Sequence, residues 1–200
     1  MPRSARIVLP GVPHHVTQRG NNRQRVFIHD DDYLQYLKLL KEYSITFHVA
    51  IHAYCLMPNH IHLVVMPSEE NSLSQAIGEA HHKYSIYFNK KYNQSGHLWQ
   101  NRFYSCPLDE PHYWKAMLYT ERNPVRAKLI LSAEQYKWSS AVAHLNRTDD
   151  FEILDKSSMN NFIQSDVWSE MLAVPEPEND ILVIRNHTNS GLKLGKFDKK

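Results

Sequence analysis

Two histidines, His60 and His62, stand two residues apart in a β-rich segment of this 200-residue chain. Side chains alternate along a strand, so both imidazoles point to one face while Ile61, Leu63 and Val65 point to the other. Two imidazoles about 7 Å apart along a strand can converge on one divalent cation and fill part of its coordination shell. The chain holds 13 histidines, so a pair of sheet histidines satisfied by neighbours is the alternative.

A metal on a strand needs a further ligand and a group that reacts. Tyr119 and Asn123 lie four residues apart in a predicted helix and therefore share one helix face. An Asn carbonyl is a suitable ligand for Mg²⁺ or Mn²⁺, and a phenol beside a metal-polarised phosphate can attack phosphorus to form a tyrosyl ester. With 11 tyrosines in the chain, spacing alone does not separate Tyr119 from an aromatic residue of the core.

The elements that would position these residues are a mixture of strands and helices. Strand patterns occupy residues 14–19, 47–57, 60–66 and a short stretch near 102–106. Helical patterns occupy residues 30–43, 72–92, 109–122, a segment from 124, and a short segment opening at 138–140. Two residues, Pro58 and Asn59, separate the second and third strands, as in an antiparallel hairpin. The order predicts an α+β domain with a small antiparallel sheet and helices on one face.

Charge divides the chain near residue 148. Residues 1–148 carry 17 Lys and Arg against 11 Asp and Glu, whereas residues 149–200 carry 6 against 10. Residues 1–25 and 80–108 contain basic residues and no acid. Clustered cations favour a polyanion, because neutralised phosphates release counterions; a solvated surface is the alternative. We expect one domain over 1–148 and an acidic C-terminal extension over 149–200, of unknown role, with a linker at 175–179.

The sequence also argues against several classes of protein. No apolar run approaches the length of about 18–20 residues that spans a bilayer, and the N-terminus lacks the apolar stretch of a signal peptide. We therefore expect a cytoplasmic protein without a membrane partner. The two cysteines, Cys55 and Cys106, form neither a disulfide framework nor a cysteine-based zinc site.

Four motifs in a fixed order carry a resemblance to a known family. They are HHVTQRGNNRQRVF, PNHIHLVV, GHLWQNRF and YTERNPVRAKL, within about residues 5–145. Together they resemble the HUH tyrosine transposases of the smallest bacterial insertion sequences, and more closely their REP-associated relatives. The resemblance implies a ferredoxin-like sandwich with a central antiparallel sheet, followed here by the C-terminal extension.

The resemblance also implies a mechanism and its residues. His60 and His62 correspond to the metal-binding pair, Asn123 completes the site for Mg²⁺ or Mn²⁺, and Tyr119 is the nucleophile. The implied activity is that of a metal-dependent single-stranded DNA endonuclease and strand transferase. It acts on palindromic DNA that folds into hairpins, and it forms a 5′-phosphotyrosine and a free 3′-hydroxyl. Relatives act as monomers or homodimers, and both states are open here.

Two polar segments are candidates for DNA binding. They combine cations and amides with one aromatic ring, groups that suit phosphates, base edges and stacking on an unpaired base. For Trp99 the alternative is a residue packed in the core. The candidate residues are Arg19, Asn21, Asn22 and Arg23 in the first segment, and Trp99, Gln100 and Arg102 in the second.

Two other functions stay open at this point. The longer opening and the extension differ from the plainest insertion-sequence members, and both favour the REP-associated branch. They leave open a domesticated, structure-specific DNA-binding protein that does not move its own gene. A metallohydrolase of a small phosphoester is disfavoured, because the sequence places no carboxylate ligand near His60 and His62.

Overall fold

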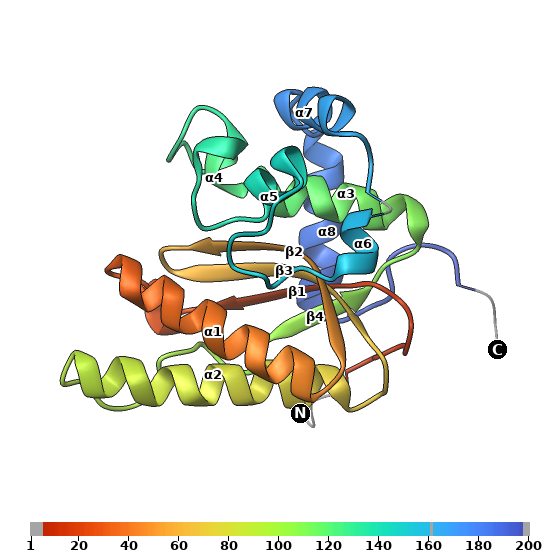
Figure 1. Cartoon of the computed structure of the whole chain (residues 1–200). Coiled ribbons are helices and arrows are strands. Elements are labelled where there is room, and N and C mark those ends of the chain that lie inside the picture. The colour runs from red at the N-terminus through yellow and green to blue at the C-terminus, as the bar shows by residue number, and fades with distance from the viewer. Residues whose placement is uncertain (1–5, 161, 198–200) are drawn as a thin grey trace.

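The computed structural model describes residues 6–160 and 162–197 (Figure 1). Four strands form one antiparallel sheet in the order β2-β3-β1-β4. A tight connection joins β2 to β3, and β3 and β1 occupy the centre, so the predicted hairpin and strand positions are confirmed. The strands are β1 His14–Arg19, β2 Val49–Met57, β3 His60–Pro67 and β4 Tyr104–Pro107.

Eight α-helices occupy the described part of the chain. The three long helical patterns of the sequence correspond to α1, α2 and α3. None of the described helices is long and apolar enough to cross a membrane. The bounds are α1 Asp30–Thr46, α2 Ser72–Lys91, α3 Glu110–Glu121, α4 Asn123–Arg126, α5 Ala141–Asn146, α6 Lys156–Asn160, α7 Ser165–Ala173 and α8 Glu178–Ser190.

One face of the sheet packs against α1 and α2, which lie together below it in Figure 1. Ile61, Leu63 and Val65 of β3 are fully buried on this face, as the alternation predicted. Tyr36 and Leu40 of α1 are buried with them, because they recur at helical spacing. This layer is the larger part of the core.

The opposite face of the sheet is covered as well, by α3 and α8. The α+β class and the central antiparallel sheet are confirmed, but the helices lie on both faces rather than on the one face expected. The reason is a second apolar surface: Ala53, Val64 and Cys106 are fully buried on this side. His60 and His62 belong to the same face, next to α3.

Two helices beyond residue 148 are built into this second layer. Trp168 of α7 is fully buried, and its indole N–H donates to the Glu121 carboxylate of α3 over 2.9 Å. After α8 the chain pairs with the end of β4, where the Leu194 N–H donates to the Pro107 carbonyl over 2.9 Å. Residues 175–179 were expected to be a linker, but α8 already begins at Glu178, so only a short segment separates it from α7. The extension therefore contacts the sheet face that carries the two histidines.

Candidate catalytic centre and DNA-binding segments

His60 and His62 converge on one face of β3, with ring centroids 5.0 Å apart. The His60 Nδ1 lies 2.7 Å from Oδ1 of Asn59. This oxygen is an acceptor, so Nδ1 carries the hydrogen and Nε2 keeps a free lone pair. In the described part of the chain, no hydrogen-bond partner is recorded for Nε2 of either histidine. The pair therefore offers nitrogen donors of the type that divalent metals bind.

A third histidine, His15 of β1, fixes the orientation of His62. His15 Nε2 lies 3.0 Å from His62 Nδ1, and His15 Nδ1 lies 2.7 Å from the Thr188 hydroxyl oxygen. Thr188 donates its own hydrogen to the Ile184 carbonyl over 2.8 Å, so its oxygen accepts from His15. His15 Nε2 then accepts from His62 Nδ1, which leaves the lone pair of His62 on Nε2. A partner of this kind commonly orients a metal-binding histidine.

Burial keeps these three imidazoles uncharged. It lowers the pKa of His15 to about 3 and that of His60 to about 4, and it places the pKa of His62 well below the usual range. The positive charge of Arg126 adds to the lowering at all three. At neutral pH the histidines are therefore in the form that binds metals.

The surroundings of the histidine pair are cationic. Arg19, Arg126 and Arg185 come from three different elements, and each lowers the pKa of His60. Arg19 ends β1 and stands directly opposite His60 in the register of the sheet. Neutral imidazoles beside arginines suit a phosphodiester, which is an anion that also accepts metal and guanidinium contacts.

Tyr119 of α3 lies against the histidines. Its ring centroid is 5.3 Å from that of His62 and 5.5 Å from that of His15, with edge-on geometry in both pairs. The side chain is 3% exposed. Its hydroxyl accepts a hydrogen bond from Nε of Arg185 over 3.1 Å, and the Arg126 guanidinium lies 4.1 Å from the ring centroid. The structure thus brings the predicted nucleophile and the predicted metal-binding pair together.

The position of Asn123 relative to the histidine pair differs from the one expected. The helix of Tyr119 ends at Glu121, and Asn123 begins the separate turn α4, so the two residues do not share one continuous helix as predicted. Its side chain is buried, but no contact with His60 or His62 is recorded in the described ranges. Within those ranges, no group of three or more His, Cys, Asp or Glu residues is arranged to hold a metal. The role of Asn123 as a further ligand therefore stays a prediction.

The two candidate DNA-binding segments lie side by side. The Asn21 N–H donates to the Leu98 carbonyl, and the Gln100 N–H donates to the Arg19 carbonyl, each over 2.8 Å. The first of these paired loops, residues 19–25, begins at the end of β1 next to His60, and the second, residues 98–102, precedes β4. Polar side chains cover them: Asn21 is half-buried, and Arg19, Asn22, Arg23, Gln100 and Arg102 are exposed.

Trp99 is the exception in the paired loops. It is 8% exposed, its indole N–H donates to the His81 carbonyl over 3.3 Å, and its ring stacks on His81 at 4.6 Å. Packing in the core, the alternative that the sequence left open, therefore describes Trp99 here. A direct contact between its ring and a base stays an untested prediction.

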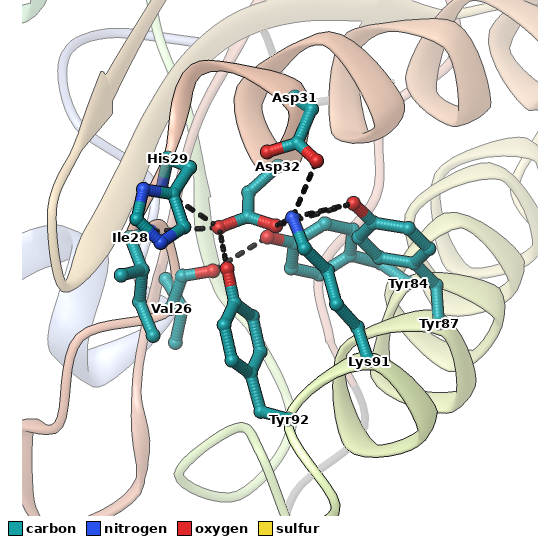
Figure 2. Close-up of polar contacts among 9 residues, drawn as sticks. All are labelled: Val26, Ile28, His29, Asp31, Asp32, Tyr84, Tyr87, Lys91 and Tyr92. Carbon is teal, nitrogen blue, oxygen red and sulfur yellow. Dashed lines mark hydrogen bonds and ion pairs between the residues drawn. The ribbon is translucent and has the colours of Figure 1, made fainter.

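A buried carboxylate fastens the segment that follows the first loop to α1 and α2, as Figure 2 shows. Asp32 accepts the backbone N–H groups of Ile28 and His29 over 2.9 and 3.0 Å, the Tyr92 hydroxyl over 2.7 Å, and the Lys91 ammonium over 2.6 Å. Burial raises the pKa of Asp32, but these hydrogen bonds together lower it more, to about 2. The carboxylate is therefore ionised at neutral pH and anchors the segment that follows the loop.

Three residues near Tyr119 were not singled out from the sequence. His15 follows the strand alternation of its segment, and that alternation could have placed it on the face of His62. Arg126 stands seven residues after Tyr119, which is a helical spacing. Arg185 lies 66 residues from Tyr119 in the acidic extension, and no local pattern of the sequence points to it.

The chain is similar to known proteins in its sequence profile and in its fold. The profile of the family described as "Transposase IS200 like" matches residues 10–123, a range that includes His60, His62 and Tyr119. The solved structure of a REP-associated tyrosine transposase bound to a REP hairpin has a similar fold, with a TM-score of 0.61 at 17% identity over 82% of this chain and 100% of that one.

A candidate transposase of Deinococcus radiodurans R1 aligns with a TM-score of 0.41 at 16% identity, over 60% of this chain and 97% of that one. No curated protein matches the chain significantly. The family profile covers more than half of the chain, and the motifs that carried the resemblance lie mostly within the matched range. The chain belongs to the IS200-like transposase family.

Proposed function

We propose that this transposase is a metal-dependent single-stranded DNA endonuclease and strand transferase whose nucleophile is Tyr119. The observation that carries the proposal is the edge-on contact between Tyr119 and His62, with ring centroids 5.3 Å apart. A phenol in this position can act on a phosphate bound at the histidine pair. The family supplies the class of enzyme, and this contact supplies the residues.

The donor set fits a divalent cation. His60 and His62 each have an Nε2 lone pair that no described residue uses, and the hydrogen bonds at Nδ1 hold both rings in place. These two residues would hold Mg²⁺ or Mn²⁺, with Asn123 as the proposed further ligand. A bound cation would polarise the scissile phosphate and offset its negative charge.

The chemical step conserves the phosphodiester bond energy. The Tyr119 oxygen bonds to phosphorus, and the bond between phosphorus and the 3′-oxygen of the preceding nucleotide breaks. The phenolic proton passes to solvent and the departing oxygen takes up a proton, which gives a 5′-phosphotyrosine and a 3′-hydroxyl. Attack by a 3′-hydroxyl reverses the step and rejoins the strand, so no nucleotide cofactor is needed. Arg19, which lies opposite His60, and Arg126, whose charge also acts on His60, are the proposed contacts of the phosphate.

The substrate we propose is palindromic DNA that folds into a hairpin with a short single-stranded flank. Support comes from the paired loops, which present arginines and amides beside His60. It comes also from the similar fold of the REP-associated tyrosine transposase, whose structure contains a REP hairpin. Cations would contact phosphates, and amides would contact base edges.

Cleavage by tyrosine variants tests the proposal. A single strand carrying a hairpin and a flank is incubated with the wild type, with Tyr119→Phe and with Tyr113→Phe, in Mg²⁺. Tyr113 is the matched control: it lies on the same helix, and its hydroxyl lies 3.1 Å from His52 Nδ1. Tyr119→Phe should lose cleavage by at least about 10³-fold and retain binding, because only the nucleophile is removed.

Two results would contradict the proposal. Cleavage by Tyr119→Phe at the wild-type rate would remove Tyr119 as nucleophile. Tight hairpin binding by the wild type without any cleavage would favour the structure-specific DNA-binding protein instead.

A further inference from the structure

We propose that Arg185 of α8 is a further catalytic residue, whose guanidinium stabilises the negative charge on the Tyr119 oxygen as the phenolic proton leaves. The inference rests on the proposed role of Tyr119. It gives the C-terminal extension a function, because Arg185 belongs to residues 149–200. These residues lie beyond the range 10–123 that the family profile matches. No local sequence pattern indicates this residue.

The contact is directed at the reacting atom. Nε of Arg185 donates to the Tyr119 hydroxyl oxygen over 3.1 Å, and this is the one hydrogen bond recorded for that oxygen among the described residues. A guanidinium donates only and stays protonated, so it cannot take the phenolic proton. What it can do is stabilise the oxygen as that proton leaves, and a charge-assisted hydrogen bond strengthens as the acceptor becomes anionic.

The second arginine near the ring has other contacts. Arg126 donates to the backbone carbonyl of Tyr119 over 3.0 Å and to the Glu176 carboxylate over 3.0 Å. Part of its charge is therefore offset by Glu176. No carboxylate is recorded as a partner of Arg185 in the described ranges. Of the two guanidiniums, Arg185 is the one whose charge is directed at the phenol oxygen.

Helix α8 is held firmly where it can present this side chain. Ile184 and Thr188 are 2% and 1% exposed, and Thr188 also supports His15. Lys115 of α3 pairs with Asp180 of α8 over 2.9 Å, which ties α8 to the helix that carries Tyr119. Residues of α8 thus contact both the Tyr119 phenol, through Arg185, and His15, through Thr188. The backbone that carries Arg185 is therefore held in place. The side chain itself is exposed, and its hydrogen bond to the Tyr119 hydroxyl directs the guanidinium at the phenol oxygen before reaction, which is the condition for electrostatic catalysis.

The test uses the full chain and single-turnover cleavage of the hairpin substrate at saturating DNA. Arg185→Ala should slow cleavage by about 10²-fold, the loss typical of removing one donor to a developing oxyanion, while DNA affinity stays unchanged. Arg185→Lys should fall between Ala and wild type, because it keeps the charge without the guanidinium geometry. Added guanidinium should restore part of the rate of Arg185→Ala and leave the wild type unaffected.

Two controls match the change in charge and in position. Lys193→Ala removes an exposed cation from the same extension, and Asn186→Ala changes an exposed neighbour on the same helix. Both should cleave at the wild-type rate. A partial rescue by guanidinium separates a catalytic role from a loss of folding, since a misfolded variant would not respond to it.

The outcomes distinguish this inference from the proposed function. A wild type that forms no Tyr119-dependent product overturns both. A wild type that cleaves through Tyr119, together with Arg185→Ala at the same rate, overturns the inference alone. Faster cleavage by Arg185→Ala overturns it as well, because Arg185 would then shield the nucleophile instead of assisting it.

Discussion

His15 and His62 share a hydrogen bond of 3.0 Å between Nε2 and Nδ1, and this bond links β1 to β3, the two central strands. A chain of hydrogen bonds continues from His15 to the Thr188 hydroxyl and from Thr188 to the Ile184 carbonyl. Each donor in it has one acceptor, so the chain has one consistent arrangement of hydrogens. It keeps His62 Nε2 free of hydrogen and directed away from His15.

The affinity of the histidine pair for a metal should depend on this chain of hydrogen bonds. Thr188→Val removes the acceptor of His15 without changing the volume much, and we expect Mn²⁺ binding to weaken by about 10-fold or more. Electron paramagnetic resonance titration without DNA measures it independently of cleavage. Thr46→Val is the control, because Thr46 makes the same bond to the carbonyl four residues earlier but lies exposed on α1. Equal affinity in both variants would remove the orienting role of Thr188.

Cleavage and binding should separate at the histidine pair. His60→Ala and His62→Ala should abolish cleavage and leave hairpin binding nearly intact, since the paired loops and not the imidazoles carry most cations. EDTA should have the same effect on the wild type, with Mg²⁺ or Mn²⁺ restoring the rate. Gel-shift and cleavage assays on one oligonucleotide compare the two activities. Unchanged cleavage in EDTA would contradict a metal-dependent mechanism; His97→Ala, on an exposed loop, is the control.

The arginines of the paired loops should determine the salt dependence of DNA binding. Each of Arg19→Ala, Arg23→Ala and Arg102→Ala should make the slope of log K against log salt less negative by about 0.7–0.9, the value for one phosphate contact. Fluorescence anisotropy over a salt series measures it. Lys38→Ala is the control, because Lys38 is exposed on α1, which covers the other face of the sheet. Equal slopes for all four variants would place the DNA elsewhere.

The dependence of the free energy of unfolding on acid pH should reveal the contribution of Asp32. Its folded-state pKa of about 2 lies below the unfolded value, so the unfolded chain binds the proton first as pH falls. The contribution of Asp32 is therefore complete near neutral pH and is lost as pH falls toward 2. Between about pH 6 and pH 2, the wild type should lose about 2 kcal/mol more unfolding free energy than Asp32→Asn. Urea titrations at each pH measure this, with Asp30→Asn as an exposed control; parallel curves would contradict the role of Asp32.

The sequence predicted those features that depend on local periodicity. Strand alternation alone placed His60 and His62 on one face and Ile61, Leu63 and Val65 on the other, because the period of a strand is fixed at two. The antiparallel hairpin followed from its two-residue connection. The conjunction of the pair with Tyr119 came from the resemblance of the ordered motifs.

Long-range packing explains what the sequence could not give. Trp99 reads as an aromatic in a polar loop, and its burial depends on His81, which belongs to a different element. The covering of the second sheet face depends on α7 and α8. The apolar residues of these helices predict that one side of each is buried, but not which surface it packs against. The contact between Arg185 and Tyr119 joins residues 66 positions apart, and no spacing rule reaches that far.

Detection of the covalent intermediate is the most direct test of Tyr119 as the nucleophile. A hairpin oligonucleotide labelled with ³²P at the scissile phosphate is incubated with the protein and Mg²⁺, denatured and digested with protease. We expect a labelled peptide whose phosphate is linked to Tyr119 through the 5′ side of the break, and no label in Tyr119→Phe. Label on another residue, or cleavage with no denaturant-resistant adduct, would contradict it.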